Sequence, residues 1–193
     1  MLKKIYEKYP FLKKYLLTPF AFNTNPNTIS LLALISAFVA GGLFYTRHYV
    51  LGALFVLLNG YLDLLDGEIA KKHNRTRPLG DFLDHFFDRV SDVVILLPLY
   101  FAPHVDNFIV FIAIILMLLA SYLGVESQAL LKKRNYSGLG GRAERMTIIF
   151  LTCMLVPLYD QSIVVGLYLI SFLCLFTVIE RFRDTYTALN KKE

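Results

Sequence analysis

Apolar residues are gathered along the chain in six long runs, and the polar residues fall mainly between them. The runs cover about Ile29–Tyr45, Tyr49–Asp66, Leu83–Phe101, Phe108–Leu131, Met146–Leu158 and Ile163–Ile179. A helix that crosses the hydrocarbon core of a bilayer needs about 20 mostly apolar residues, with a range of about 17–25. The runs reach or approach this length, and the short fifth run is expected to begin earlier, near Arg142. The pattern therefore predicts an all-α membrane protein with six transmembrane helices.

The first residues follow a different pattern, in which apolar side chains recur at helical spacing with lysines between them. The apolar positions are Leu2, Ile5, Tyr6, Tyr9, Leu12, Leu16 and Leu17. This spacing is typical of an amphipathic helix that lies in the membrane interface, and a solvated basic tail is the alternative. We therefore divide the chain into an interfacial amphipathic helix, residues 1–20, and a six-helix membrane domain, residues 21–193.

Composition excludes an ordinary soluble domain, and the charges predict the orientation in the membrane. Hydrophobic residues make up 56% and charged residues 18% of the chain, whereas soluble domains have about 45–50% and about 25%. Of the 20 lysines and arginines, only Arg47 lies on one side of the predicted bundle and Arg89 within a run. Basic loops stay in the cytoplasm, so both termini are expected there. We expect a protein of the cytoplasmic membrane, with the bilayer as a partner and no nucleic-acid partner.

Acidic residues are concentrated at the facing ends of the second and third runs. The stretch Tyr61–Asp92 holds seven of the 15 acids of the chain. Asp63 and Asp66 are three residues apart, and Asp84 and Asp88 are four apart, so each pair lies on one helix face. Glycines between the two pairs leave room for the chain to reverse. We therefore expect both pairs to converge on one point, which opens to the cytoplasm.

Four carboxylates at one point would repel each other and would need a compensating cation. Oxygen ligands favour hard ions such as Mg²⁺, Mn²⁺ or Ca²⁺, and two ions bridged by carboxylates suit phosphate transfer. Two alternatives are open. Intramembrane acids also line cation and proton pathways in transporters, and acids at helix ends are often solvated caps, which is what we expect of Asp81 and Asp92.

The same acids form part of a longer motif. From Asp63 to Asp88 the chain reads D-x-x-D-G-x-x-A-K-x8-G-x-x-x-D-x-x-x-D. This pattern resembles the signature of the CDP-alcohol phosphotransferases, D-x-x-D-G-x-x-A-R-x8-G-x-x-x-D-x-x-x-D, and departs from it only at Lys71. Residues 26–30, Pro-Asn-Thr-Ile-Ser, resemble the family's entry into the first membrane helix. The resemblance covers essentially the whole chain.

The resemblance implies a reaction and a role for each motif residue. Members of the family move a phosphatidyl-type group from a CDP-linked lipid, CDP-diacylglycerol or an ether analogue, to an alcohol and release CMP. By resemblance, a pair of Mg²⁺ or Mn²⁺ ions is held by Asp63, Asp66, Asp84 and Asp88, and Asp88 is the general base for the acceptor hydroxyl. The CDP-binding positions would be Asn27, Ser30, Asp66, Gly67, Ala70, Lys71, Gly80 and Asp84. The family also implies a homodimer.

Three of these positions can be interpreted from their chemistry. Gly67 and Ala70 leave a helix face open to a flat base and a pyrophosphate, because a longer side chain would block their approach. Lys71 keeps the positive charge of the family's Arg but cannot form the two parallel hydrogen bonds that Arg makes to a phosphate. A basic loop residue that follows the positive-inside rule is the alternative for Lys71.

A second basic patch precedes the fifth run. Arg142 and Arg145 share a helix face, and Arg clusters bind phosphate well, so we expect Arg134, Arg142 and Arg145 to hold a phosphate of the acceptor alcohol. Membrane anchoring is the alternative, and is what we expect of Lys132 and Lys133. Three glycines in this segment are expected to loosen the loop.

The acceptor itself is suggested by a finer resemblance. The segment GRAERM, residues 141–146, is similar to one in prokaryotic phosphatidylinositol-phosphate and archaetidylinositol-phosphate synthases, whose acceptor is inositol phosphate. Ser121 and Tyr122 resemble the Ser-Tyr pair of those enzymes, but the Arg that commonly follows is Gly124 here. We therefore expect inositol phosphate, with glycerol 3-phosphate or serine as alternatives. A small cation transporter that uses the Asp cluster is the alternative of another class.

Overall fold

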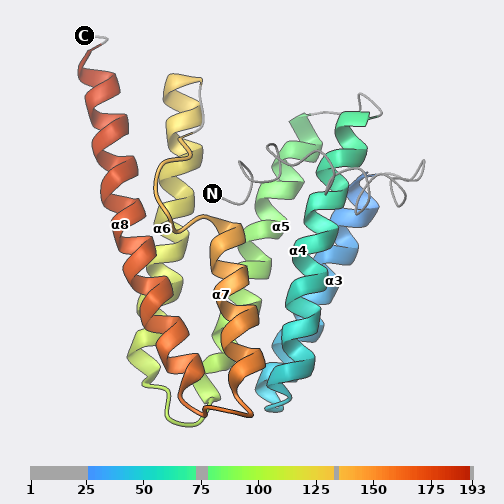
Figure 1. The fold of residues 1–193 in the computed structure, drawn as a ribbon. Coiled ribbons are helices and arrows are strands. Elements are labelled where there is room, and N and C mark those ends of the chain that lie inside the picture. Colours follow the sequence, from blue (N-terminus) through green and yellow to red (C-terminus); the bar gives the residue numbers. More distant parts are fainter. Residues whose placement is uncertain (1–25, 73–77, 133–134, 192–193) are drawn as a thin grey trace. The chain divides into compact units, whose positions relative to one another are not determined.

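The computed structural model describes residues 26–72, 78–132 and 135–191, and for residues 70–72 the backbone alone. These residues form six α-helices and one short 3₁₀ helix, and they contain no strand (Figure 1). The elements are α3 (Pro26–Tyr45), α4 (Tyr49–Lys72), α5 (Pro78–Leu96), η2 (Leu97–Phe101), α6 (Asn107–Leu131), α7 (Arg142–Leu155) and α8 (Ser162–Asn190). The chain divides after Ala102 into two compact units.

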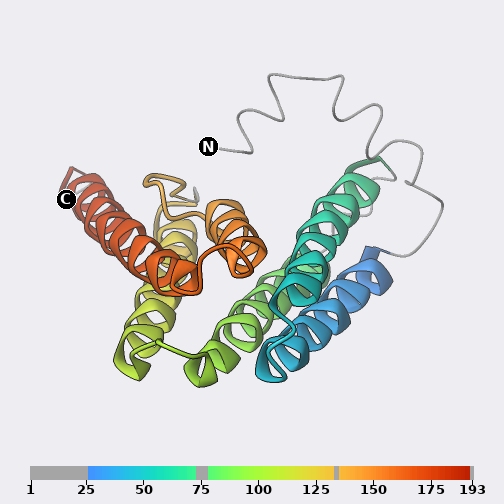
Figure 2. The same cartoon turned by 60° about the horizontal axis from the view of Figure 1, so that its bottom comes forward.

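In the first unit, α3 lies against both α4 and α5, as two views show (Figures 1 and 2). Small residues on α3 make this close packing possible. A Cβ at Gly41 would lie 2.5 Å from the carbonyl oxygen of Val94 on α5, so only glycine fits there. Between α3 and α4, the buried Asn59 donates a hydrogen bond of 2.8 Å from Nδ2 to the carbonyl oxygen of Ala33.

The turn from α3 to α4 is short because one residue takes the left-handed conformation. Arg47 has φ 64°, and the amide of His48 donates to the carbonyl oxygen of Leu43 at 2.8 Å. Such a turn satisfies the last carbonyls of a helix. The two helices therefore run antiparallel, which brings the start of α3 beside the end of α4.

In the second unit, α8 lies against both α6 and α7. The approach of α8 to α7 again depends on a small residue, since a Cβ at Gly166 would lie 2.7 Å from the side chain of Thr152. The hydroxyl of Ser162 also donates to the carbonyl oxygen of Thr152 at 2.8 Å. At the start of α6, the side chain of Asp106 caps the helix by accepting from the amide of Phe108 at 2.9 Å.

Four of the described helices are long and apolar enough to cross a membrane: α3, residues Tyr49–Ile69 of α4, α6 and α8. Their outer faces carry many exposed Leu, Ile and Phe side chains. The other two helices differ for separate reasons. Helix α5 carries four acids and Arg89, and α7 has only 14 residues, which is about 21 Å at 1.5 Å per residue.

The six helices lie where the six apolar runs predicted helices, and most ends are shifted by a few residues. Helix α4 continues past Asp66 to Lys72, and α8 continues past Ile179 to Asn190. Helix α7 begins at Arg142, as expected. The third run is divided between α5 and η2, because Pro98 interrupts the regular hydrogen bonding. The predicted interfacial helix, residues 1–20, lies outside the described residues.

Candidate metal and substrate site

Three of the four motif aspartates meet between α4 and α5. One carboxylate oxygen from each of Asp63, Asp66 and Asp84 lies within 4.8 Å of the other two. Asp66 is buried, and Asp63 and Asp84 are half-buried. The spacing of three residues on α4 and the reversal of the chain bring these three groups together, whereas the sequence predicted that Asp88 would join them.

The start of α3 completes this end of the first unit. The hydroxyl of Ser30 donates to Oδ2 of Asp66 at 2.6 Å, a short bond of the kind that a charged acceptor makes. Asn27, one turn earlier, has its Oδ1 3.6 Å from where a Cβ on Gly80 would lie. The residues Asn27 and Ser30 therefore stand beside the motif residues of α4 and α5.

Glycine leaves free space beside the aspartates. A Cβ at Gly67 would meet no atom within 4 Å, so the helix face next to Asp66 is open. At Gly80 a Cβ would make only an ordinary contact with Asn27. The side chains of Ala70 and Lys71 lie outside the described part of the chain.

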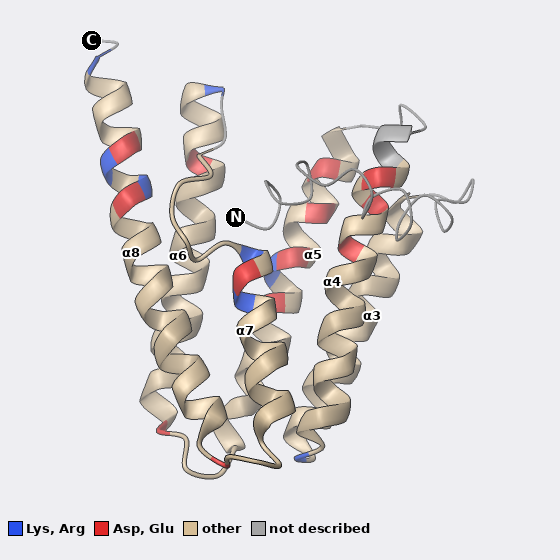
Figure 3. Cartoon of the chain, viewed as in Figure 1, with Lys and Arg blue, Asp and Glu red and all other residues tan. Residues whose placement is uncertain are grey.

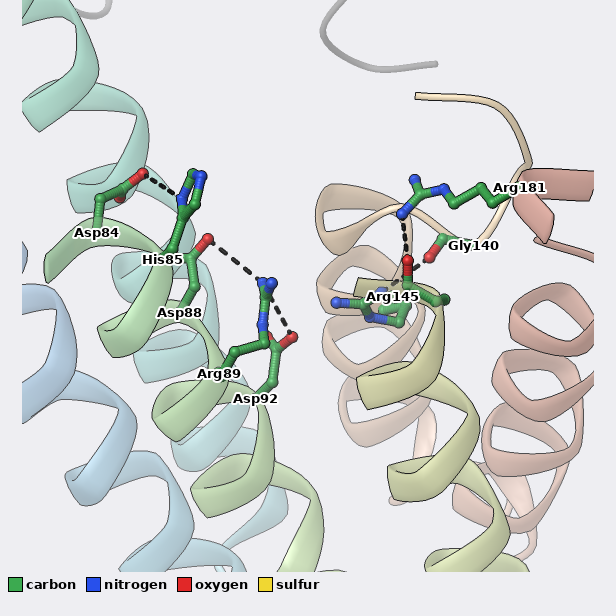
Figure 4. Close-up of polar contacts among 9 residues, drawn as sticks. Asp84, His85, Asp88, Arg89, Asp92, Gly140, Arg145 and Arg181 are labelled. Carbon is green, nitrogen blue, oxygen red and sulfur yellow. Dashed lines mark hydrogen bonds and ion pairs between the residues drawn. The ribbon is translucent and has the colours of Figure 1, made fainter. Parts of the chain in front are cut away.

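Asp88 lies one turn further along α5 and takes part in a different contact. Its Oδ2 is 3.4 Å from Nη2 of Arg89, and the same Nη2 is 3.7 Å from Oδ2 of Asp92 (Figure 4). Nearer the start of α5, Nδ1 of His85 lies 3.6 Å from Oδ2 of Asp84. Asp88 is thus on the same helix face as Asp84 but is not one of the three converging carboxylates.

Figure 3 shows acids near the end of α4 and along α5. Asp63 and Asp66 lie in the second half of α4 and Asp84 in the first half of α5, whereas Asp88 and Asp92 lie further along α5. The turn at the other end of α3 and α4 carries Arg47. Asp63, Asp66 and Asp84 converge nearer to the end of α4 and the start of α5, an arrangement that suits a site at the boundary between membrane and water.

One expectation for this stretch is wrong. Asp92 is not a solvated residue at a helix end, because it lies inside α5 with none of its side chain exposed. The Arg89 guanidinium, three residues earlier, provides the opposite charge. That spacing within an apolar run was the signal in the sequence that could have revealed a buried pair. Asp81 is exposed in the first turn of α5, in agreement with the expectation.

The segment before α7 is docked onto α8, so the expectation that its glycines loosen it is also wrong. Gly138 has φ +93° and lies against Thr177, and a Cβ on Gly140 would be 2.8 Å from the carbonyl oxygen of Leu173. The amide of Gly140 donates to Oγ1 of Thr177 at 2.8 Å. These glycines permit a close approach of two backbones rather than mobility.

Two arginines hold this segment from either side (Figure 4). Arg145 on α7 is buried, and its Nη1 donates to the carbonyl oxygen of Gly140 at 2.8 Å. Arg181 on α8 donates from Nε to the carbonyl oxygen of Ser137 at 3.0 Å, and from Nη1 to that of Ala120. Arg142 is half-buried at the first position of α7, and Arg134 lies outside the described residues.

Arg181 was not singled out from the sequence. Its Nη1 lies 3.0 Å from where a Cβ on Gly124 would be. A guanidinium from α8 is therefore present beside Gly124, the position at which the resemblance led us to expect an Arg. Its distance in sequence from Gly124 explains why no local pattern indicated it.

The donor set of the aspartate cluster suits a hard cation. Three carboxylates from two helices supply only oxygen, and no Cys lies near them in the sequence. Ions such as Mg²⁺ and Mn²⁺ prefer such ligands. The short bond from Ser30 fixes one carboxylate in place, which is the usual role of a hydrogen bond behind a metal ligand.

Comparison with known sequences agrees with this chemistry. The sequence model of one protein family, CDP-alcohol phosphatidyltransferase, matches residues 23–179. The archaetidylinositol phosphate synthase of Pyrococcus horikoshii is 26% identical over 81% of the chain and 80% of its own length. The phosphatidylinositol phosphate synthase of Streptomyces avermitilis is 28% identical over 86% of the chain and 75% of its own length.

Solved structures share the fold. The crystal structure of the Mycobacterium tuberculosis phosphatidylinositol phosphate synthase with CDP-DAG bound superposes with a TM-score of 0.79, at 22% identity, over 88% of the chain and 93% of that protein. The same enzyme has also been crystallised in complex with manganese and citrate, with a TM-score of 0.79.

Proposed function

Since the chain belongs to the CDP-alcohol phosphatidyltransferase family, we propose that it transfers a phosphatidyl-type group from a CDP-linked lipid to a hydroxyl of inositol phosphate and releases CMP. Membership of this family makes the chain an integral membrane protein and a transferase of phosphate-containing groups. A cation transporter that uses the same acids is set aside for this reason. The observation that carries the proposal is the convergence of Asp63, Asp66 and Asp84.

The aspartates would hold divalent cations, Mg²⁺ or Mn²⁺, as a pair of ions. Asp63, Asp66 and Asp84 already lie close enough for shared ligation, and Asp88 follows on the same face of α5. Bound there, the ions would neutralise the pyrophosphate and make its phosphorus more electrophilic. Manganese in the crystals of the Mycobacterium tuberculosis enzyme supports the choice of a hard ion.

Asp88 would act as the general base. The acceptor hydroxyl oxygen attacks the phosphorus that carries the lipid, and a new P–O bond forms as the hydroxyl proton passes to the Asp88 carboxylate. The bond between that phosphorus and the bridging oxygen breaks, and CMP leaves with the electron pair. An alcohol is a poor nucleophile at neutral pH, so a positioned base is required for this step.

The CDP group would lie on the open face beside Asp66. Gly67 and Gly80 leave space there, and Asn27 and Ser30 from α3 offer polar groups at the same end. Ala70 and Lys71 follow on α4, where a small residue and a cation suit a nucleotide and its phosphates. CDP-DAG bound to the Mycobacterium tuberculosis enzyme supports a lipid nucleotide as the donor.

The acceptor phosphate would be bound by Arg134, Arg142 and Arg145. The burial of Arg145 and its bond to Gly140 suit a role in holding the segment that leads into α7. Two relatives are named as inositol phosphate synthases, which favours inositol phosphate over glycerol 3-phosphate or serine.

The protein would work as a homodimer in the cytoplasmic membrane, with six crossings and the aspartates facing the cytoplasm. Of the 20 basic residues, the single one in the turn between α3 and α4 is Arg47. The positive-inside rule therefore supports this orientation.

The test is release of CMP by purified protein. With Mn²⁺ and CDP-diacylglycerol or its archaeal ether analogue, we expect turnover with inositol phosphate and little with glycerol 3-phosphate, serine, inositol or glycerol. EDTA should abolish turnover and added Mn²⁺ should restore it. Asp88→Asn should lower kcat by at least about 100-fold, the scale of general base catalysis.

Two results would contradict parts of the proposal. Turnover with glycerol 3-phosphate or serine alone would replace the acceptor and leave the reaction class intact. No CMP from any donor and acceptor in the panel, with protein that is folded by thermal melting, would overturn the reaction itself.

A further inference from the structure

We propose that Asp92, acting through Arg89, holds the carboxylate of Asp88 in the orientation in which it receives the proton of the acceptor hydroxyl. Asp92 and Arg89 are then positioning residues, because neither touches the reacting atoms. The inference rests on the proposed function and adds two residues that lie outside the D-x-x-D and D-x-x-x-D pairs of the motif.

The geometry places Arg89 between two carboxylates (Figure 4). Its Nη2 is 3.4 Å from Asp88 and 3.7 Å from Asp92. Neighbouring residues on a helix point about 100° apart at 3.6 residues per turn, so the Arg89 side chain must bend back to reach Asp88. Asp92, three residues on, lies on the side of the helix from which it can hold Arg89 in that bent form.

The burial of Asp92 strengthens its ion pair with Arg89. The side chain of Asp92 is 0% exposed, whereas that of Asp88 is 15% and that of Arg89 is 23% exposed. A charge in a buried site has little water to screen it, so an ion pair there constrains its partners more strongly than on a surface. Asp92 is therefore a buried anchor, and of the two carboxylates Asp88 is the one that remains partly accessible.

Stability alone does not account for such an anchor. A buried ion pair often stabilises a fold no better than apolar residues of similar volume would. An acid near the C-terminal end of a helix is also disfavoured by the helix dipole, and Asp92 lies four residues before the end of α5 at Leu96. Asp92 must therefore serve something other than stability. Its ion pair with Arg89 connects it to Asp88.

The anchor also limits what Arg89 does to Asp88. An Arg with no other partner can form two parallel hydrogen bonds to one carboxylate, which would occupy the oxygens of Asp88. With Asp92 attracting the same Nη2, Arg89 holds Asp88 from one side. The contact between the two side chains is made by Nη2 of Arg89 and Oδ2 of Asp88.

The test compares the steady-state kinetics of variants on α5. In purified protein with Mn²⁺, CDP-diacylglycerol and inositol phosphate, Asp92→Asn should lower kcat by about 10–100-fold, the range for loss of a supporting contact behind a functional group. The KM values for both substrates should stay within about twofold, because ground-state binding is unchanged. Asp81→Asn removes an exposed acid from the same helix and is the matched control, with wild-type kcat expected.

A double variant separates positioning through Arg89 from an independent effect. Arg89→Gln should lower kcat as Asp92→Asn does, and the double variant should lose no more than the larger single loss. Multiplicative losses in kcat would overturn the inference, because Asp92 would then act without Arg89. Wild-type kcat in Asp92→Asn, or a loss that appears only in KM, would also overturn it.

Thermal melting shows whether each variant still folds. Each variant is melted in detergent, and if Asp92→Asn does not fold, Arg89→Lys takes its place, since Lys keeps the charge but contacts one carboxylate as a point charge. A lowered kcat at unchanged KM is then expected, and an unchanged kcat overturns the inference. Wild-type turnover tests the proposed function separately, so failure of the variants alone leaves that function standing.

Discussion

At the scale of single residues, glycines that lack a side chain leave free space on the surface of α4. Gly60 and Gly67 are both on α4, and at either position a Cβ would meet no atom within 4 Å. They differ in what lies beside them, because Gly67 follows Asp66 of the aspartate cluster. In the proposed reaction no substrate group lies beside Gly60, whereas the nucleotide would fill the space beside Gly67.

The pair allows a matched prediction. Gly67→Ala should raise the KM for the CDP-linked lipid by about tenfold, since small displacements of a bound substrate are costly. Gly60→Ala should leave KM unchanged. Both should keep or raise the melting temperature, because Ala is favoured over Gly within a helix by about 1 kcal/mol. An equal KM in both variants would show that the nucleotide does not use the face at Gly67.

At the scale of elements, the position of α3 determines what surrounds the aspartates. The start of α3 carries Asn27 and Ser30, and Ser30 bonds to Asp66 across a sequence separation of 36 residues. Further along, Gly41 lies so close to α5 that its Cβ would be 2.5 Å from the backbone oxygen of Val94. Packing near the end of α3 therefore supports the geometry at its start.

Adjacent glycines on α3 test this dependence. Gly41→Ala should destabilise the protein by about 1–3 kcal/mol, the cost of an inserted methyl group in a packed contact, and should lower CMP release because Ser30 shifts away from Asp66. Gly42→Ala is the control, since a Cβ there meets nothing within 4 Å. Thermal melting and turnover are measured together. Equal melting temperatures for the two variants would mean that α3 and α5 can separate at no cost.

At the scale of the whole molecule, the length and charge of each helix bear on how the chain crosses the bilayer. Four described helices are long and apolar enough on their own. Helices α5 and α7 do not meet that criterion, and α5 fails it because it carries the charges of the proposed site. In the topology that we propose, α5 and α7 also cross the membrane and the aspartates face the cytoplasm.

Labelling of single introduced cysteines tests the orientation. In intact bacterial cells that express the protein, Arg47→Cys should react with a membrane-impermeant maleimide, and Lys191→Cys, beyond the end of α8, should react only after permeabilisation. Cys153 and Cys174 are buried and form no disulfide, so the native background should be low. Reaction of Lys191→Cys in intact cells would reverse the proposed topology.

Much of the site could be predicted from the sequence because its members lie close together along the chain. Asp63 and Asp66, and Asp84 and Asp88, are within one or two helical turns of each other, so helical periodicity alone places each pair on a face. The family motif then related the two pairs. Arg181 and Asp92 were missed or misassigned, because their partners and their burial follow from how helices pack rather than from spacing.

The amino-acid sequence by itself determined the helical class, the positions of the six helices and the family, since each depends on local apolar periodicity or on a linear motif. Only the tertiary structure decided which three aspartates converge, that Asp92 is buried against Arg89, and that the glycines before α7 dock the chain onto α8. These features depend on contacts between residues far apart in the sequence. Such contacts form wherever side chains of several helices fit together, and the pattern along one helix does not specify that fit.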